Sequence, residues 1–268
     1  IASGRLMKLI IQNLAIEYED RKEGSASSAG KPASSADRET ILFLHGWQSD
    51  MRTFDGLAAS LASGRRIVRL DLPGFGKSER PKKPWNLGDY VQFVKDFIQK
   101  IEINPDILIG HSFGGRIILK GEGEGILKAQ KNILIGAAGV SQRNKARNTF
   151  LKVLAKIFGL VFYIPPLIFW REKIRRKLYD AIGSGYYNAG TLKESFVKII
   201  SEDLSEQAKK IPAPTLLIWG REDSETPLSD GQKLSHLLLQ SKLLVFDGGH
   251  FIHQEKSKEV IQVIKEFI

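Results

Sequence analysis

Short apolar runs alternate with amphipathic stretches along most of the chain. Runs typical of buried strands lie at residues 41–44, 67–70, 107–109, 133–135, 215–219 and 243–246. Between and after them, apolar residues recur at helical spacing over residues 53–62, 87–101 and 254–267. Strands that alternate with helices of this length predict an α/β domain, in which helices cover both faces of a mostly parallel sheet.

The N-terminal region departs from this alternation. Residues 7–11 and 14–18 have the pattern of two short strands joined at Gln12 and Asn13, which predicts a hairpin. Residues 21–38 then consist mainly of serine, alanine, glycine and charged residues. We expect this segment to be a flexible surface loop within the domain and not a boundary between domains.

A second interruption lies between residues 141 and 210, where helical patterns occur without a clear strand. Residues 157–170 form an uncharged, strongly apolar stretch of 14 residues. A membrane-spanning helix needs about 18 or more such residues, and Pro165 and Pro166 would break this one. An inserted helical cap over one end of the sheet fits best. A pair of core helices and a helix docked on a membrane surface stay open as alternatives.

Composition narrows the classes of function. The chain has 268 residues, enough for one large domain or two small ones, and its lack of cysteine excludes disulfides and thiolate metal sites. The formal net charge is +10, but the basic residues are dispersed apart from one dense patch at residues 171–177. That patch is typical of a solvated helix face, with weak attraction to acidic surfaces as the alternative. We expect no nucleic-acid partner.

The first residues of the sequence give an expectation for the cellular compartment. The first residues show no basic region followed by an apolar core, the pattern of a secretory signal. We therefore expect a cytoplasmic protein, a monomer or homodimer, without stable insertion in a membrane.

The stretch around Ser112 carries the strongest chemical signal. An apolar run ends at Gly110 and a helix-compatible stretch begins at Phe113, so residues 110–114 match the Gly-x-Ser-x-Gly pattern between a strand and a helix. A Cβ at Gly110 or Gly114 would crowd the neighbouring strand or helix in so tight a turn. The serine hydroxyl is then lifted clear of the sheet edge, beside the first N–H groups of a helix.

With the Gly-x-Ser-x-Gly motif placed between a strand and a helix, and with the alternation of strands and helices, the chain resembles the α/β-hydrolase superfamily along nearly its whole length. The resemblance implies a core of residues 1–140 and 211–268 with about eight strands, and a helical cap at residues 141–210. It also implies a catalytic triad in the chain order nucleophile, acid, histidine. On this pattern Ser112 is the nucleophile, Asp223 follows the strand at 215–219 as the acid, and His250 follows the last strand as the base.

Neighbouring residues offer competing assignments. Glu222 and Glu225 flank Asp223, but the family's spacing from the preceding glycine favours Asp223. His253 is the serious rival of His250, which holds the family position. The remaining histidines are expected to have structural or surface roles: His45, His111 and His236.

The expected chemistry is acyl transfer. A serine hydroxyl becomes a nucleophile when an imidazole takes its proton, and the carboxylate behind the imidazole holds the required tautomer. The resemblance assigns the two oxyanion donors to the backbone N–H groups of Trp47 and Phe113. Trp47, Phe162 and Trp170 are expected to line the acyl pocket. No metal site or cofactor is implied.

Several reactions use this triad. We expect a serine hydrolase of small to medium carboxylic esters or lactones, including acyl-homoserine-type lactones. Hydrolysis of a carbon–carbon bond in vinylogous diketones and perhydrolase activity are alternatives. A small-molecule receptor on the same fold is disfavoured by the intact triad. Haloalkane dehalogenases and epoxide hydrolases are excluded, because they have aspartate at the position of Ser112.

Two glycine-containing stretches add smaller expectations. Residues 74–78 resemble the end of a phosphate-binding loop, but the first glycine of that pattern is replaced by Asp71, so the nucleotide interpretation fails. Three glycines in residues 121–125 are expected to shorten or fray the helix after Ser112, which is longer and alanine-rich in the family.

Overall fold

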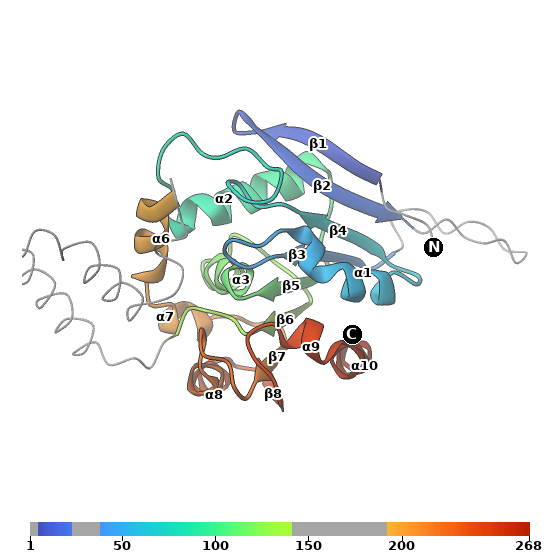
Figure 1. Ribbon diagram of the computed structural model, residues 1–268, viewed down its shortest axis with the longest axis vertical. Helices are drawn as coiled ribbons and strands as arrows, with labels where there is room; N and C mark the ends of the chain where they lie inside the picture. Colours follow the sequence, from blue (N-terminus) through green and yellow to red (C-terminus); the bar gives the residue numbers. More distant parts are fainter. Residues whose placement is uncertain (1–4, 23–37, 141–191) are drawn as a thin grey trace, which may run out of the picture.

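The computed structural model describes residues 5–22, 38–140 and 192–268 (Figure 1). In this part of the chain eight strands form one sheet, in the order β1-β2-β4-β3-β5-β6-β7-β8. The pairs β1–β2 and β2–β4 are antiparallel, and all other neighbours are parallel. The strands are β1 (Arg5–Ile11), β2 (Leu14–Lys22), β3 (Thr40–Leu44), β4 (Arg66–Leu70), β5 (Ile107–His111), β6 (Lys131–Ile135), β7 (Thr215–Gly220) and β8 (Ser241–Phe246).

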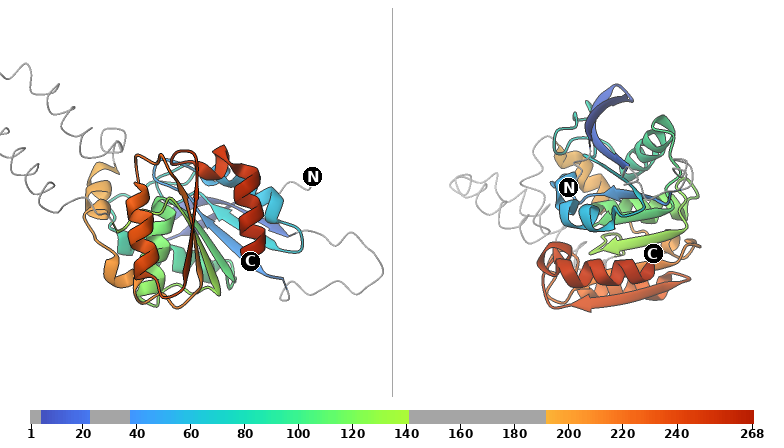
Figure 2. Two further views of the ribbon diagram at one scale, coloured as in Figure 1. Left: turned by 90° about the horizontal axis from the view of Figure 1, so that it is seen from below. Right: turned by 90° about the vertical axis from the view of Figure 1, so that its right-hand side faces the viewer.

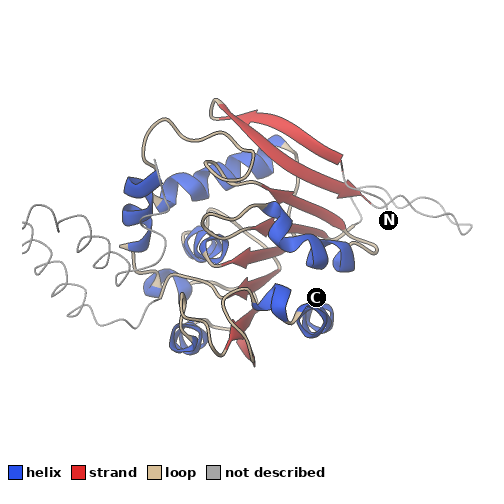
Figure 3. Cartoon of the chain, viewed as in Figure 1, coloured by secondary structure: helices blue, strands red, loops and turns tan. Residues whose placement is uncertain are grey.

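Helices cover both faces of the sheet (Figure 2, left; Figure 3). On one face lie η1 (Met51–Phe54), α1 (Asp55–Leu61), α9 (Ile252–Glu255) and α10 (Ser257–Phe267), which share one hydrophobic cluster. On the other lie α2 (Leu87–Lys100), α3 (Phe113–Gly123), α7 (Ser205–Ala208) and α8 (Leu228–Leu237), which share a second cluster. The three-layer α/β architecture predicted from the alternating pattern is confirmed.

The strand β3 shows why the central strands have continuous apolar runs. Leu42 and Leu44 pack into the cluster on one face, whereas Ile41 and Phe43 pack into the cluster on the other. Successive side chains of a strand point to opposite faces, so a strand covered on both sides needs apolar residues at every position.

The predicted N-terminal hairpin is present. β1 and β2 pair in register up to Ile11 and Leu14, and Gln12 and Asn13 form the turn with φ values of 49° and 63°. A two-residue turn with both φ values positive matches the right-handed twist of the strands it joins. β2 then pairs with β4, where Arg66 forms an ion pair with Asp20 at 2.6 Å.

The helix after Ser112 ends within the glycine-containing stretch, as expected. α3 runs from Phe113 to Gly123, so it stops inside residues 121–125. A Cβ on Gly121 would lie 2.5 Å from Cδ1 of Leu127, and a Cβ on Gly123 would lie 2.5 Å from the carbonyl oxygen of Gln207. Besides ending the helix, these glycines therefore allow neighbouring segments to pack closely on its last turn.

Part of the predicted cap lies against the core. In α6 (Lys193–Ile200), the hydroxyl of Ser195 accepts a hydrogen bond from the backbone N–H of Trp85 at 2.9 Å. The rest of the predicted cap, residues 141–191, lies outside the described residues. Phe162, Trp170 and the basic patch at 171–177 belong to that segment, and most of the predicted loop at 21–38 is also outside. The division into core and cap stays a prediction.

Membrane crossing can be judged for the described helices. None of the helices in the described ranges combines the length and the apolar character needed to cross a bilayer.

Candidate active site

The carboxyl ends of β3 and β5 lie side by side in the middle of the sheet. β3 lies between β4 and β5 in the sheet. The chain segments that follow β3 and β5 therefore leave the carboxyl ends of these two strands toward opposite sides. In open parallel sheets ligands bind at such a switch point, outside the carboxyl ends of the strands. The candidate residues lie on the loops that follow the strands at this edge.

Ser112 occupies the tight turn between β5 and α3. Its φ and ψ are 49° and −106°, a backbone conformation that non-glycine residues rarely adopt. Two hydrogen bonds to the neighbouring β6 region fix the turn. The N–H of Ser112 donates to the carbonyl of Ile135 at 2.9 Å, and its own carbonyl accepts from the N–H of Ala138 at 3.2 Å. A strained residue held by its surroundings is typical of functional sites.

The two glycines beside Ser112 are required by space. A Cβ on Gly110 would lie 2.5 Å from the backbone nitrogen of Gly115, and a Cβ on Gly114 would lie 1.8 Å from the carbonyl oxygen of Leu44. Both contacts are with backbone atoms, which cannot move aside without disturbing the sheet or the helix. The crowding predicted from the sequence motif is confirmed.

Asp223 and His250 form a direct hydrogen bond. Nδ1 of His250 lies 2.7 Å from Oδ2 of Asp223, and both residues are buried. The other oxygen, Oδ1, accepts the backbone N–H groups of Glu225 at 2.9 Å and Thr226 at 2.8 Å. The Thr226 hydroxyl also lies 2.8 Å from Oδ2. The turn after β7 therefore holds the carboxylate in one orientation.

This pairing decides which nitrogen of His250 carries hydrogen. An ionised carboxylate only accepts hydrogen bonds, so the Nδ1–H of His250 donates to Asp223. In the neutral ring Nε2 is then an unprotonated acceptor, which is the state that a general base requires.

His111 connects His250 to the loop that carries Ser112. The Nε2 of His111 lies 3.1 Å from the carbonyl oxygen of His250, and the two ring centroids are 4.7 Å apart. Among the described residues, however, no hydrogen bond joins the hydroxyl of Ser112 to the ring of His250. Catalytic hydrogen bonds are often loose without substrate, so a serine and histidine on adjoining loops can still come together.

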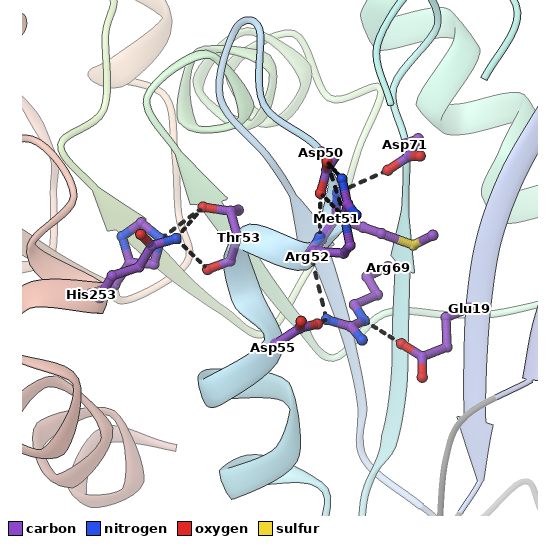
Figure 4. A network of polar contacts seen from close by, with 10 residues as sticks. Glu19, Asp50, Met51, Arg52, Thr53, Asp55, Arg69, Asp71 and His253 are labelled. Atoms are coloured by element: carbon purple, nitrogen blue, oxygen red, sulfur yellow. Dashed lines mark hydrogen bonds and ion pairs between the residues drawn. The ribbon is translucent and has the colours of Figure 1, made fainter. Parts of the chain in front are cut away.

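His253, the rival of His250, lies in different surroundings (Figure 4). It is buried, and its Nε2 lies 3.2 Å from the hydroxyl of Thr53. Burial, with a smaller contribution from His250, lowers the pKa of His253 to about 4. The carboxylate of Asp223 bonds to His250 and not to His253.

The other histidines occupy structural or surface positions, as the sequence predicts. His45 is fully buried, and its Nε2 accepts the N–H of Leu72 at 2.9 Å. Burial lowers the pKa of His45 and, still further, that of His111. His236 is exposed on α8.

The loop after β3 lies against Ser112. A Cβ on Gly46 would lie 3.4 Å from the Cβ of Ser112, so the loop at Gly46 packs against the serine. Within the described part of the chain, the backbone N–H groups of Trp47 and Phe113 donate to no acceptor. An oxyanion site requires N–H donors that have no partner within the protein, so both groups stay candidates for that role.

A polar network fixes the 3-10 helix that follows this loop (Figure 4). The carboxylate of Asp71 accepts the backbone N–H of Met51 at 2.8 Å, and the carboxylate of Asp50 accepts that of Arg52 at 2.8 Å. Asp71 also accepts the N–H of Lys77 at 2.8 Å. Asp71, which replaces the first glycine of the phosphate-binding pattern, therefore connects the loop at Met51 to the loop at Lys77.

Aromatic rings surround the Trp47 side chain. Its ring centroid lies 4.8 Å from that of Phe75, 5.3 Å from that of Phe113 and 5.2 Å from that of Phe196. Phe196, on α6, was not among the predicted site residues. It lies inside the helical segment predicted to be a cap, but helical spacing alone does not identify its partner.

Glu225 is a second residue whose position the sequence did not reveal. Its Oε2 lies 3.6 Å from Nε2 of His250, the nitrogen on the far side of the ring from Asp223. Sequence reasoning treated Glu225 only as a competitor for the role of the acid. Its proximity to the imidazole depends on how the loops after β7 and β8 pack.

A cavity of about 380 Å³ lies elsewhere, between β2, β4 and η1. Its lining contains acidic and basic side chains that pair with one another, including Arg69 with Glu19 and Asp55 (Figure 4). Ser112, Asp223 and His250 are not among its lining residues.

Comparison with known proteins identifies relatives that match most of the chain. An uncharacterized hydrolase, YugF, of Bacillus subtilis is 26% identical over 247 residues, which are 86% of this chain and 90% of that protein. The 2-hydroxy-6-oxononadienedioate/2-hydroxy-6-oxononatrienedioate hydrolase of Escherichia coli is 24% identical over 253 residues, 86% of this chain and 87% of that protein.

Solved structures show the same fold. The esterase EaEST from Exiguobacterium antarcticum superposes with a TM-score of 0.71 at 20% identity, and the alignment covers 99% of both chains. Residues 41–263 match the family model described as "Alpha/beta hydrolase family". With its eight-stranded, mostly parallel sheet between two layers of helices, this protein belongs to the alpha/beta hydrolase family.

Proposed function

We propose that this protein is a serine hydrolase of small to medium carboxylic esters or lactones, with Ser112 as nucleophile, His250 as base and Asp223 as the acid. The hydrogen bond of 2.7 Å between His250 and Asp223 carries the proposal, since it orients an imidazole on the loop adjoining a strained serine. No cofactor is needed, because these groups can supply every proton transfer in ester hydrolysis.

The reaction begins at Ser112. As its hydroxyl oxygen attacks the carbonyl carbon, Nε2 of His250 takes the hydroxyl proton, and Asp223 stabilises the resulting imidazolium. Substrate binding must bring the hydroxyl within hydrogen-bonding distance of Nε2. The negative oxygen of the tetrahedral intermediate accepts the N–H groups of Trp47 and Phe113, each worth about 3–4 kcal/mol of the barrier.

The intermediate then collapses to an acyl-enzyme. The bond to the leaving oxygen breaks, and the proton on Nε2 passes to that oxygen, which releases the alcohol. Water repeats the sequence: His250 takes its proton, the hydroxide adds to the acyl carbon, and Ser112 leaves with the proton returned. In a lactone the alcohol freed in the first step remains part of the acyl chain, and the second step releases a single hydroxy acid.

The aromatic cluster supports an apolar acyl group. Trp47 contacts Phe75, Phe113 and Phe196, so the surface beside the oxyanion donors offers rings on which an aliphatic chain can pack. Phe162 and Trp170 are proposed to complete this pocket from the cap.

Hydrolysis of a carbon–carbon bond is the second candidate. It is favoured by the similarity to the E. coli hydrolase, whose name specifies a dienedioate or trienedioate substrate. The same serine, histidine and oxyanion donors would act, so the geometry of these residues does not separate the two reactions.

A substrate panel tests the proposal. p-Nitrophenyl esters of increasing acyl length, lactones and a vinylogous diketone are compared for kcat/KM with the wild-type protein and with Ser112→Ala. We expect ester or lactone turnover that Ser112→Ala abolishes, with an unchanged circular dichroism spectrum. A fluorophosphonate should label Ser112, as located by mass spectrometry. Labelling at another residue, or full activity in Ser112→Ala, would overturn the assignment.

A further inference from the structure

The imidazole of His250 lies between two carboxylates. Asp223 bonds to Nδ1 at 2.7 Å, and Oε2 of Glu225 lies 3.6 Å from Nε2. Asp223 supplies the support that a triad requires. Glu225 is not needed for that support, and it lies next to the nitrogen that must exchange protons with the nucleophile and the leaving group.

The two carboxylates differ in their exposure to solvent. The side chain of Asp223 is 1% exposed and that of His250 is 6% exposed, whereas that of Glu225 is 50% exposed. Glu225 therefore lies where the buried pair meets the solvent. Among the described residues its ion-pair partner is His250, and no described lysine or arginine pairs with it.

The backbone of Glu225 is held by the acid itself. Its N–H donates to Oδ1 of Asp223 at 2.9 Å, next to the bond from the N–H of Thr226 at 2.8 Å. The turn that orients the acid thus also sets the position from which the Glu225 side chain reaches Nε2.

We propose that Glu225 selects substrates by the charge of the leaving group, favouring cationic alcohols over neutral ones and disfavouring anionic ones. The inference rests on the proposed function, in which Nε2 protonates the leaving oxygen. Glu225 takes no proton in the reaction. It acts through its charge on the substrate that reaches His250.

The geometry limits how far the leaving group can be from this charge. For proton transfer the leaving oxygen must come within about 3 Å of Nε2. It therefore lies no more than about 7 Å from Oε2 of Glu225. A unit charge a few bonds along the alcohol is at a range where Coulomb interaction in a partly solvated site changes binding roughly threefold to tenfold and is weakened by salt.

The test uses three butyrate esters of similar shape and different charge. Butyrylcholine is cationic, 3,3-dimethylbutyl butyrate is its neutral isostere, and the butyrate ester of isethionate is anionic. The ratio of kcat/KM for the cationic and anionic esters is measured by titrating released acid, at low and at high NaCl concentration. The proteins are the wild type, Glu225→Gln and Glu225→Lys.

Glu222→Gln is the matched control. Glu222 is an exposed glutamate on the same loop, and removing its charge changes the net charge by the same amount. Glutamine at position 225 keeps the length of the side chain and the backbone bond to Asp223, so folding should be preserved. Thermal unfolding of each variant checks this.

We expect the wild-type protein to prefer the cationic ester, and Glu225→Gln to lower the cationic-to-anionic ratio about tenfold at low salt. Glu225→Lys should lower it further, high salt should reduce the difference, and Glu222→Gln should leave the ratio within twofold. An unchanged ratio in Glu225→Gln, or an equal fall in Glu222→Gln, would overturn the inference while leaving the hydrolase proposal intact. If the wild type hydrolyses none of the three esters and a fluorophosphonate does not label Ser112, both the inference and the hydrolase proposal would be overturned.

Discussion

Oδ2 of Asp223 lies 2.7 Å from Nδ1 of His250, at the point where the loops after β7 and β8 meet. The bond is buried, and the turn from Asp223 to Thr226 supplies further donors to the same carboxylate. This buried hydrogen bond holds the imidazole in one tautomer and one orientation. Its contribution to kcat can be measured by mutation.

Asp223→Asn is expected to lower kcat by about 10⁴-fold with a small loss of stability. The amide nitrogen that replaces Oδ2 would donate to Nδ1 and force hydrogen onto Nε2, so the ring could no longer accept the serine proton. Steady-state kinetics on a p-nitrophenyl ester measures the effect. Asp247→Asn is the control, because Asp247 is exposed and pairs only with Arg221 among the residues described. Equal activity in Asp223→Asn and the wild type would reject Asp223 as the acid.

Alanine substitutions at His250 and His253 should have different effects on kcat and on stability. His250→Ala is expected to lower kcat by about 10⁴- to 10⁶-fold, since it removes the group that moves the proton. His253→Ala should keep kcat within about tenfold and lower the free energy of unfolding by about 1–3 kcal/mol, because it removes one of the hydrogen bonds of the Thr53 hydroxyl and opens a buried space. The opposite pattern would assign the base to His253.

The buried His253 should make stability depend on pH. Its folded pKa of about 4 lies below the ordinary value of 6.5, so the unfolded chain takes up a proton first as the pH falls. The stabilisation is complete above pH 6.5 and is lost between pH 6.5 and about 4, by about 3 kcal/mol in total.

Urea unfolding at pH 7.5, 5.5 and 4.5 measures this loss. His253→Gln should make the dependence shallower over that range, while His45 and His111, whose pKa values burial also lowers, maintain the rest. His236→Gln, at an exposed position on α8, should leave the dependence unchanged. A curve that keeps the wild-type slope in His253→Gln would assign the dependence to other groups.

The turn at Ser112 should not tolerate a methyl group at residue 114. Gly114→Ala would bring Cβ within 1.8 Å of the Leu44 carbonyl oxygen, and relieving that clash must separate α3 from β3. We expect a loss of roughly 3 kcal/mol or more and a fall in melting temperature. Gly56→Ala is the control. Gly56 is exposed in α1, and a Cβ there meets only Oγ of Ser257 at 3.4 Å. That change should raise stability by about 0.5–1 kcal/mol.

Local rules account for what the sequence predicts well. The strands and most helices follow from apolar spacing, and the turn at Ser112 follows from glycines that leave no room for a side chain. The assignment of Asp223 and His250 drew on resemblance, because 26 residues separate them in the chain and no local pattern links their side chains. The structure brings them together because β7 and β8 are parallel neighbours that end at the same edge of the sheet.

Where the sequence was silent, contacts between distant residues decided the outcome. The glycines at 121 and 123 mark the end of α3, but the sequence does not reveal that Leu127 and Gln207 pack closely on them. By itself the sequence determined the order of strands and helices, the strained serine and the set of candidate histidines, because these depend on residues a few positions apart. Only the tertiary structure determined that Glu225 faces the second nitrogen of His250, since that distance depends on how two loops pack after the sheet has formed.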